Sequence, residues 1–199
     1  SMQAIAHGSD SVQYFQFRKG RGGKEKFHGA IVDHACSSDT RIFNIVKEVG
    51  ETINKIDEIA GTGVKSKAAI LFDRENSWAI QYATGFNNGD KKYTETCENY
   101  YRAFWKEGVN VDIINSEGNF SKYSIIVAPM LYSLSEKTID KIEKYVKTGG
   151  WIYSTYMSGY VNENDLCYLG GFPSGVLKTV FGIVNEEIDS LYETDEYIV

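Results

Sequence analysis

Glu25 and His28 are the residue pair whose types and spacing most clearly suggest chemistry, and they follow a glycine-rich stretch at 20–23. A spacing of three places both side chains on one side of a helical turn. A carboxylate accepts hydrogen bonds and an imidazole donates or accepts one, so the pair could bind the hydroxyl groups of a sugar. The same two residues could also form only a surface ion pair. The spacing alone leaves both interpretations open.

The three cysteines indicate neither a metal site nor a disulfide framework. Cys36, Cys97 and Cys167 lie far apart and form no C-x-x-C pair. A free cysteine usually behaves as a small hydrophobic residue, and an odd count fits a reducing compartment. We therefore expect a cytoplasmic protein with no bound metal.

The glycine-containing segments do not match cofactor-binding or nucleophile motifs. No P-loop or dinucleotide fingerprint is present. The stretch 170–175 contains Pro173 and lacks the Lys or Thr of a phosphate-binding loop, so it predicts a structured surface loop. Ser158 lacks the preceding glycine of a G-x-S-x-G elbow and is interpreted as a turn residue. No cofactor is expected.

Composition excludes several further classes of partner. The chain has 199 residues, 42% of them apolar and 24% charged, with a formal net charge of -6. This acidic balance disfavours nucleic-acid binding, because phosphate backbones attract basic surfaces. The chain also lacks the roughly 18 consecutive apolar residues of a membrane helix, and its N-terminus does not resemble a signal peptide.

The first third of the chain predicts an incomplete β/α unit. Residues 2–7 form the end of a helix that stops at Gly8, and residues 11–17 are rich in the β-branched and aromatic residues of strands. A helix follows over 40–59, capped by Asp39 or Ser38. The predicted strand has no partner here to satisfy its backbone groups. A linker is expected over 60–67.

The rest of the chain predicts alternating strands and helices. Strands are expected over 67–73, 109–114, 124–128 and 151–155, with helices over 94–107 and from a capping box of Ser133 and Glu136 to Gly149. Alternation of this kind is typical of a parallel sheet with helices on both faces. We therefore expect an α/β, doubly wound, flavodoxin-like domain over about 65–191.

Several segments together resemble the family 42 β-galactosidases over nearly the whole chain. In the first third these are QAIAHG at 3–8, YFQFR at 14–18, RGGKEKFHGA at 21–30 and VDH at 32–34. In the rest they are LFD at 71–73, YYRAFW at 100–105, VAPMLY at 127–132, SG at 158–159, NEND at 162–165 and LGG at 169–171.

The resemblance implies a division into two parts. Residues 1–60 would be the last strand, loop and helix of a (β/α)₈ barrel, and residues 61–199 the trimerisation domain, flavodoxin-like and similar to class I glutamine amidotransferases. Glu25 and His28 match positions that contact galactose in the family. Phe17 stands where the family often has Trp.

The resemblance also implies what this chain lacks. Family members are retaining hydrolases with two catalytic glutamates, both of which match positions upstream of Ser1, and a barrel needs about 250 residues. The chain would therefore carry no catalytic residue, would be inactive alone, and would assemble as a homotrimer.

Two alternatives from other classes stay open. A free-standing flavodoxin-like module could bind a small ligand at the carboxyl ends of its strands. An amidotransferase-like or hydrolytic enzyme would need a nucleophile beside a histidine, and all three histidines precede residue 35.

Overall fold

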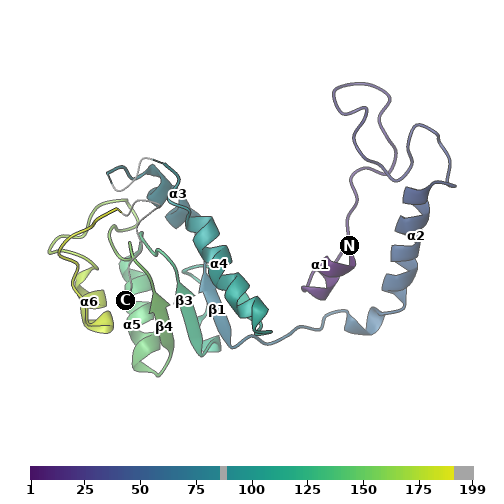
Figure 1. The fold of residues 1–199 in the computed structure, drawn as a ribbon. Helices are drawn as coiled ribbons and strands as arrows, with labels where there is room; N and C mark the ends of the chain where they lie inside the picture. Colours follow the sequence, from purple (N-terminus) through teal and green to yellow (C-terminus); the bar gives the residue numbers. More distant parts are fainter. Residues whose placement is uncertain (86–88, 191–199) are drawn as a thin grey trace. The chain divides into compact units, whose positions relative to one another are not determined.

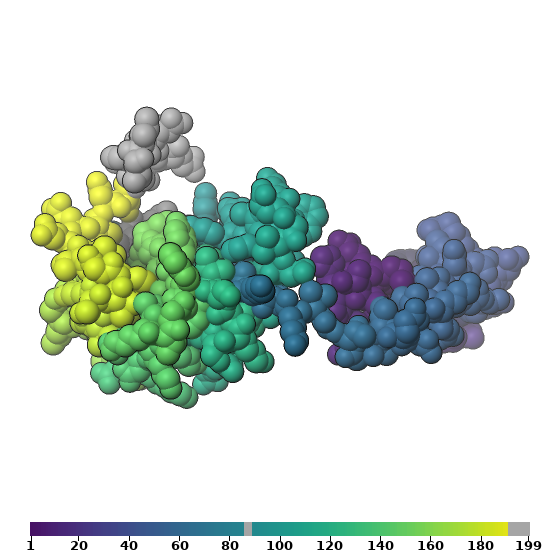
Figure 2. All heavy atoms as spheres, turned by 90° about the horizontal axis from the view of Figure 1, so that it is seen from below, coloured from purple at the N-terminus to yellow at the C-terminus, as the bar shows by residue number. Residues whose placement is uncertain are grey.

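The computed structural model of the chain describes residues 1–85 and 89–190. It divides into two compact units, Ser1–Val64 and Lys65–Val199, which are purple to blue and blue to yellow in Figures 1 and 2. Residues 191–199, the end of the expected second domain, lie outside the described residues. Each unit is described by itself.

Unit 1 is built from two helices and long connecting loops. They are α1 (Met2–Ala6), α2 (Arg41–Asn54) and a short 3₁₀ turn at Asp57–Ile59. The chain leaves α1 through Gly8, whose φ of +93° favours glycine, as the sequence predicts. Thr40 caps α2 by accepting a hydrogen bond from the Phe43 N–H at 3.3 Å. The expected cap at Asp39 or Ser38 is therefore wrong, because only Thr40 directly precedes the first helical residue.

The strand expected over 11–17 is not formed in unit 1. The only pairing there is an isolated parallel bridge between Arg18 and Val32. Residues 11–17 do have side chains that favour strands. A strand also needs neighbouring strands to satisfy its backbone N–H and C=O groups, and residues 1–64 contain none.

Unit 2 contains a parallel sheet of four strands in the order β2-β1-β3-β4 (Figure 1). The strands are β1 (Ala68–Leu71), β2 (Val111–Ile114), β3 (Ile125–Ala128) and β4 (Trp151–Ser154). All four fall inside the ranges that the sequence predicts. The two central strands are uninterrupted apolar runs, as expected for strands that are buried on both faces.

Among the described residues, four α-helices and a 3₁₀ turn at Phe120–Lys122 connect or follow these strands. The α-helices are α3 (Arg74–Tyr82), α4 (Tyr93–Lys106), α5 (Glu136–Lys147) and α6 (Gly175–Phe181). The sequence analysis missed α3 and α6, which are short and lie in polar or glycine-rich segments. It also misplaced the cap of α5: Ser135, not Ser133, accepts the N–H of Thr138 at 3.2 Å.

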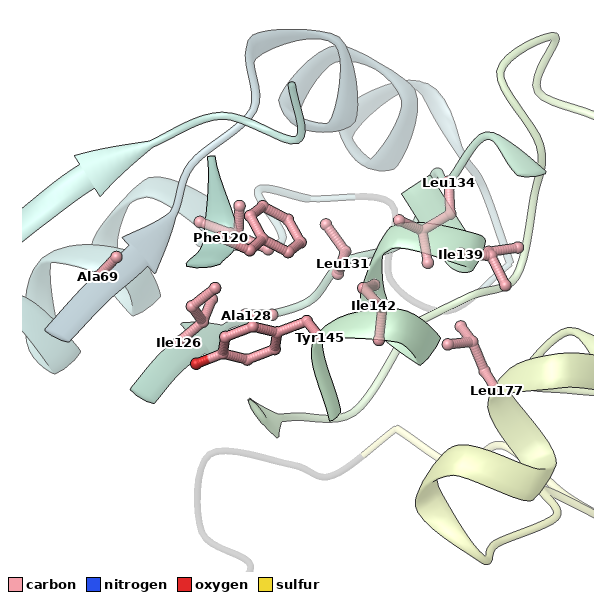
Figure 3. Close-up of a cluster of buried hydrophobic side chains, with 11 residues drawn as sticks. Ala69, Phe120, Ile126, Ala128, Leu131, Leu134, Ile139, Ile142, Tyr145 and Leu177 are labelled. Carbon is pink, nitrogen blue, oxygen red and sulfur yellow. The ribbon is translucent and has the colours of Figure 1, made fainter. Parts of the chain in front are cut away.

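Each face of the sheet has its own hydrophobic cluster. On one face, Ile126 and Ala128 of β3 meet Tyr145 and Ile142 of α5, and Leu177 of α6 closes the cluster (Figure 3). On the other face, α3 and α4 pack against the side chains of β1 and β3 that point the opposite way, since successive residues of a strand face opposite sides of the sheet. This second cluster includes Ile70, Ile80, Tyr93, Cys97 and Val127. The prediction of a parallel sheet covered on both faces is confirmed.

Candidate functional site

The loop that carries Glu25 and His28 is closed at its base by backbone pairing. Val32 N–H donates to Phe17 O at 2.8 Å, and Lys19 N–H donates to Val32 O at 2.9 Å. Val32 is also the only buried hydrophobic residue among the described residues of unit 1. These hydrogen bonds therefore hold the two ends of the loop together, while residues 21–29 between them are exposed.

Glu25 and His28 lie on one tight turn of this loop. The His28 N–H donates to Glu25 O at 2.8 Å, and the ring of Phe15 meets the imidazole edge-on at 5.4 Å between centroids. The Nδ1 atom of His28 lies 3.2 Å from Gly29 O, which leaves Nε2 for another partner. Both residues are exposed. The turn can thus present a carboxylate, an imidazole nitrogen and an aromatic face together.

His34 and His7 have structural roles instead. The Nε2 atom of His34 lies 2.9 Å from Gly20 O, and the Phe27 ring meets the imidazole at 6.4 Å between centroids. His7 follows the last residue of α1, and its N–H donates to the carbonyls of that helix. These contacts give His34 a packing role and place His7 in the C-terminal cap of α1.

The carboxyl ends of the unit 2 strands are joined by a polar network. Asp73 caps α3 through the Glu75 N–H at 3.1 Å, and its second oxygen accepts the Ser116 hydroxyl at 2.6 Å. Asn76 is almost fully buried: it donates to Met130 O at 2.9 Å and accepts from Ser133 N–H at 2.8 Å. Asp73 therefore joins the segments that follow β1 and β2, and Asn76 joins those that follow β1 and β3.

Ser158 is part of the same network, through its hydroxyl group. Its hydroxyl accepts the Leu131 N–H at 3.1 Å and lies 3.0 Å from Thr155 O. No histidine belongs to unit 2. Ser158 lies in the bent segment after β4, between Met157 and Gly159, which both have positive φ, and its hydroxyl is used in structural hydrogen bonds.

Two ionisable side chains, Tyr93 and Cys97, lie inside the cluster beneath α4. Burial raises the pKa of the Cys97 thiol to about 11, and burial also raises the pKa of the Tyr93 phenol above its ordinary value. The Tyr93 hydroxyl accepts the Asp73 N–H at 3.0 Å. Both groups are therefore neutral at physiological pH and act as packing residues.

Across residues 1–85 and 89–190, no group of three or more His, Cys, Asp or Glu side chains is arranged to hold a metal ion. No helix in the same ranges is long and apolar enough to cross a membrane.

Sequence reasoning missed Asn76 as a structural residue, because it lies in the polar segment whose helix was not foreseen. The available signal was Asp73, a good cap residue directly after an apolar strand, with Asn76 three positions later. Its partners Met130 and Ser133 are more than 50 residues away, which no local pattern reveals.

Two family profiles match the chain. Residues 66–199 match the β-galactosidase trimerisation domain, and residues 1–56 match the β-galactosidase profile of glycoside hydrolase family 42. The first match covers more than half of the chain.

Curated relatives and solved structures match over almost the full chain. Beta-galactosidase Pbg of Clostridium perfringens is 52% identical over 98% of this chain and 28% of its own length. Beta-galactosidase GanA of Bacillus subtilis is 46% identical over 100% of this chain and 30% of its own. The structure of Gan42B, a GH42 β-galactosidase from G. stearothermophilus, is 48% identical with a TM-score of 0.92, over 98% of this chain and 28% of that one. The chain thus spans less than a third of these relatives.

Proposed function

This chain belongs to the β-galactosidases of glycoside hydrolase family 42, and from that premise we propose that it provides the trimerisation domain and part of the galactose pocket of a retaining β-galactosidase. The match of residues 66–199 to the trimerisation profile carries the proposal. The enzyme would release terminal β-galactose from its substrates, while this chain alone would be inactive.

The proposed division assigns residues 1–60 to the last β/α unit of the catalytic barrel and 61–199 to the trimerisation domain. In support, α2 has an apolar stripe but no buried residue, as expected of a helix that packs on strands beyond this chain. The strand order 2-1-3-4 agrees with the start of the flavodoxin-like order 2-1-3-4-5. Both observations support a barrel helix followed by a flavodoxin-like domain.

Within the pocket, we assign Glu25 and His28 to binding galactose hydroxyls. The exposed carboxylate would accept hydrogen bonds, the His28 Nε2 atom would make another, and Phe15 would offer a ring face to the apolar side of the sugar. The loop at the end of a barrel strand is where such chemistry is found in this architecture.

The three cysteines support the proposed cytoplasmic location. All three are free thiols, with Cys36 and Cys167 exposed and Cys97 buried. Free exposed thiols are typical of reducing compartments.

Light scattering coupled to size exclusion tests the assembly role. The purified chain should have a mass of three times 22.4 kDa and should not cleave a chromogenic β-galactoside. A monomer at all concentrations would contradict the assembly role, and turnover above a mock preparation would contradict the proposed inactivity.

The pocket assignment needs an active enzyme, which a chimaera provides. This chain would replace the matched segment of the Clostridium perfringens β-galactosidase, to which it is 52% identical. Glu25→Gln in the chimaera should lower kcat/KM by about 10- to 100-fold, because a charge-assisted hydrogen bond to the sugar is weakened. Glu58→Gln, outside the loop, is the matched control. An unchanged kcat/KM for Glu25→Gln would contradict the assignment of Glu25 to galactose binding.

A further inference from the structure

Unit 2 has three exposed aromatic side chains and one half-buried aromatic side chain where β4 ends the described sheet. Trp151, Tyr153 and Tyr156 are exposed to 75%, 51% and 64%, and Tyr100 of α4 lies beside them. These four residues are called the aromatic face. β4 pairs with β3 on one side, and no strand of residues 1–85 or 89–190 pairs on its other side.

The register shows which side of the sheet carries the aromatic face. Tyr153 pairs with Val127, which pairs with Ile70, and side chains of paired residues point to the same side. Ile70 and Val127 belong to the cluster beneath α3 and α4. Trp151, two residues before Tyr153, points to that side as well.

α4 covers only part of this side of the sheet. It packs on β1 and β2, and Figure 1 shows it beside β1, with β4 at the other end of the sheet. The Tyr100 ring reaches across to Tyr153, with 5.7 Å between centroids. Burial and the neighbouring phenols of Tyr153 and Tyr156 raise the pKa of Tyr100 to about 12. The Tyr100 and Tyr153 rings are therefore in contact, and Trp151 is exposed on the same side of the sheet.

We propose that the aromatic face is a contact surface for a second copy of this chain in the trimer. The inference rests on the proposed assembly role, since the domain that displays the face matches a trimerisation profile. Tyrosine and tryptophan are enriched in the cores of protein interfaces and dominate their binding energy. Contiguous apolar patches of this kind are uncommon on the surface of monomers.

Symmetry restricts how the face is used. A closed ring of three copies has heterologous contacts, in which one surface of each copy meets a different surface of the next. Pairing of two β4 edges would instead be two-fold and would produce dimers. In the proposed trimer the aromatic face therefore docks on a part of the neighbouring copy other than its β4.

Trp151→Glu tests the surface directly. The variant should dissociate at concentrations where the wild type is trimeric, with a dissociation constant raised about 30-fold or more, as for a central interface tryptophan. Lys144→Glu, exposed on α5 over the opposite side of the sheet, is the control and should stay trimeric. Trp151→Phe should keep most of the affinity. Far-UV circular dichroism establishes that each variant is folded.

Photo-crosslinking identifies what lies on the face. With p-benzoylphenylalanine in place of Trp151, irradiation should produce a band at twice 22.4 kDa, with the label joined to a segment other than β4 of another copy. A crosslink within one chain, or one joining two β4 strands, overturns the proposal. A trimeric Trp151→Glu variant overturns this surface but leaves the assembly role intact, whereas a monomeric wild type overturns both.

Discussion

Units 1 and 2 have similar sequence signals but very different interiors. Unit 2 buries two clusters of apolar side chains on the two sides of its sheet. Unit 1 has a helix with a clear apolar stripe and a segment rich in β-forming residues, yet only Val32 of its described hydrophobic residues is buried. Phe15 and Phe17 stay exposed to 69% and 63%. Local pattern thus predicts an element, but its stability depends on what it packs against.

Amide hydrogen exchange should show the largest difference between the units. Core amides of α5 should exchange about 10³-fold or more slowly than those of α2, because they open only with the whole domain. Mass spectrometry of peptides from the intact chain measures this. Comparable protection in both helices would mean that unit 1 finds a packing partner in solution.

Matched Ile→Ala substitutions in the two units should give the next largest difference, measured as the change in the free energy of unfolding. Ile142→Ala removes a fully buried side chain and should lower the free energy of unfolding by about 2–5 kcal/mol. Ile45→Ala in α2, where the side chain is 44% exposed, should change it by less than about 0.5 kcal/mol. Urea unfolding followed by circular dichroism gives both values, and equal effects would remove the distinction.

Asn76→Ala should weaken unit 2 alone. The change leaves Met130 O and Ser133 N–H without their side-chain partner in a buried setting, at a cost of about 1–3 kcal/mol. Asn164→Ala at an exposed loop position is the control. Thermal unfolding of both variants measures the difference; a neutral Asn76→Ala would show that water or a shifted loop replaces the bridge.

Alkaline pH should lower the stability of unit 2 by a smaller amount, through the buried thiol of Cys97. The Cys97 pKa is raised from 9.0 to about 11, so the folded state holds this proton more tightly than the unfolded chain. Stability is therefore unaffected below pH 9 and falls between pH 9 and 11, by about 1–3 kcal/mol. Urea titrations across that range measure it. Cys97→Ala should reduce this loss of stability between pH 9 and 11. If the loss is unchanged in the variant, other ionisable groups cause it.

The parts of the fold predicted correctly are those with a strong local signal. The apolar runs at 68–71 and 125–128 and the long amphipathic helices α4 and α5 fall where their periodicity indicates. The short α3 and α6 were missed because they offer too few turns for a periodic pattern. Of the candidate site, the turn joining Glu25 and His28 follows from their spacing, and their role in binding sugar stays a prediction.

The sequence by itself determined the four strands and the two long helices of unit 2, the parallel character of its sheet and the family. Apolar runs, helical periodicity and extended motifs are local properties, and they can be recognised without knowing which residues are in contact. Only the tertiary structure decided that residues 11–17 are not a strand, that Asn76 contacts residues more than 50 positions away, and that the rings of Tyr100 and Tyr153 lie together. The reason is physical: backbone pairing, burial and surface patches depend on neighbours that are remote in the chain.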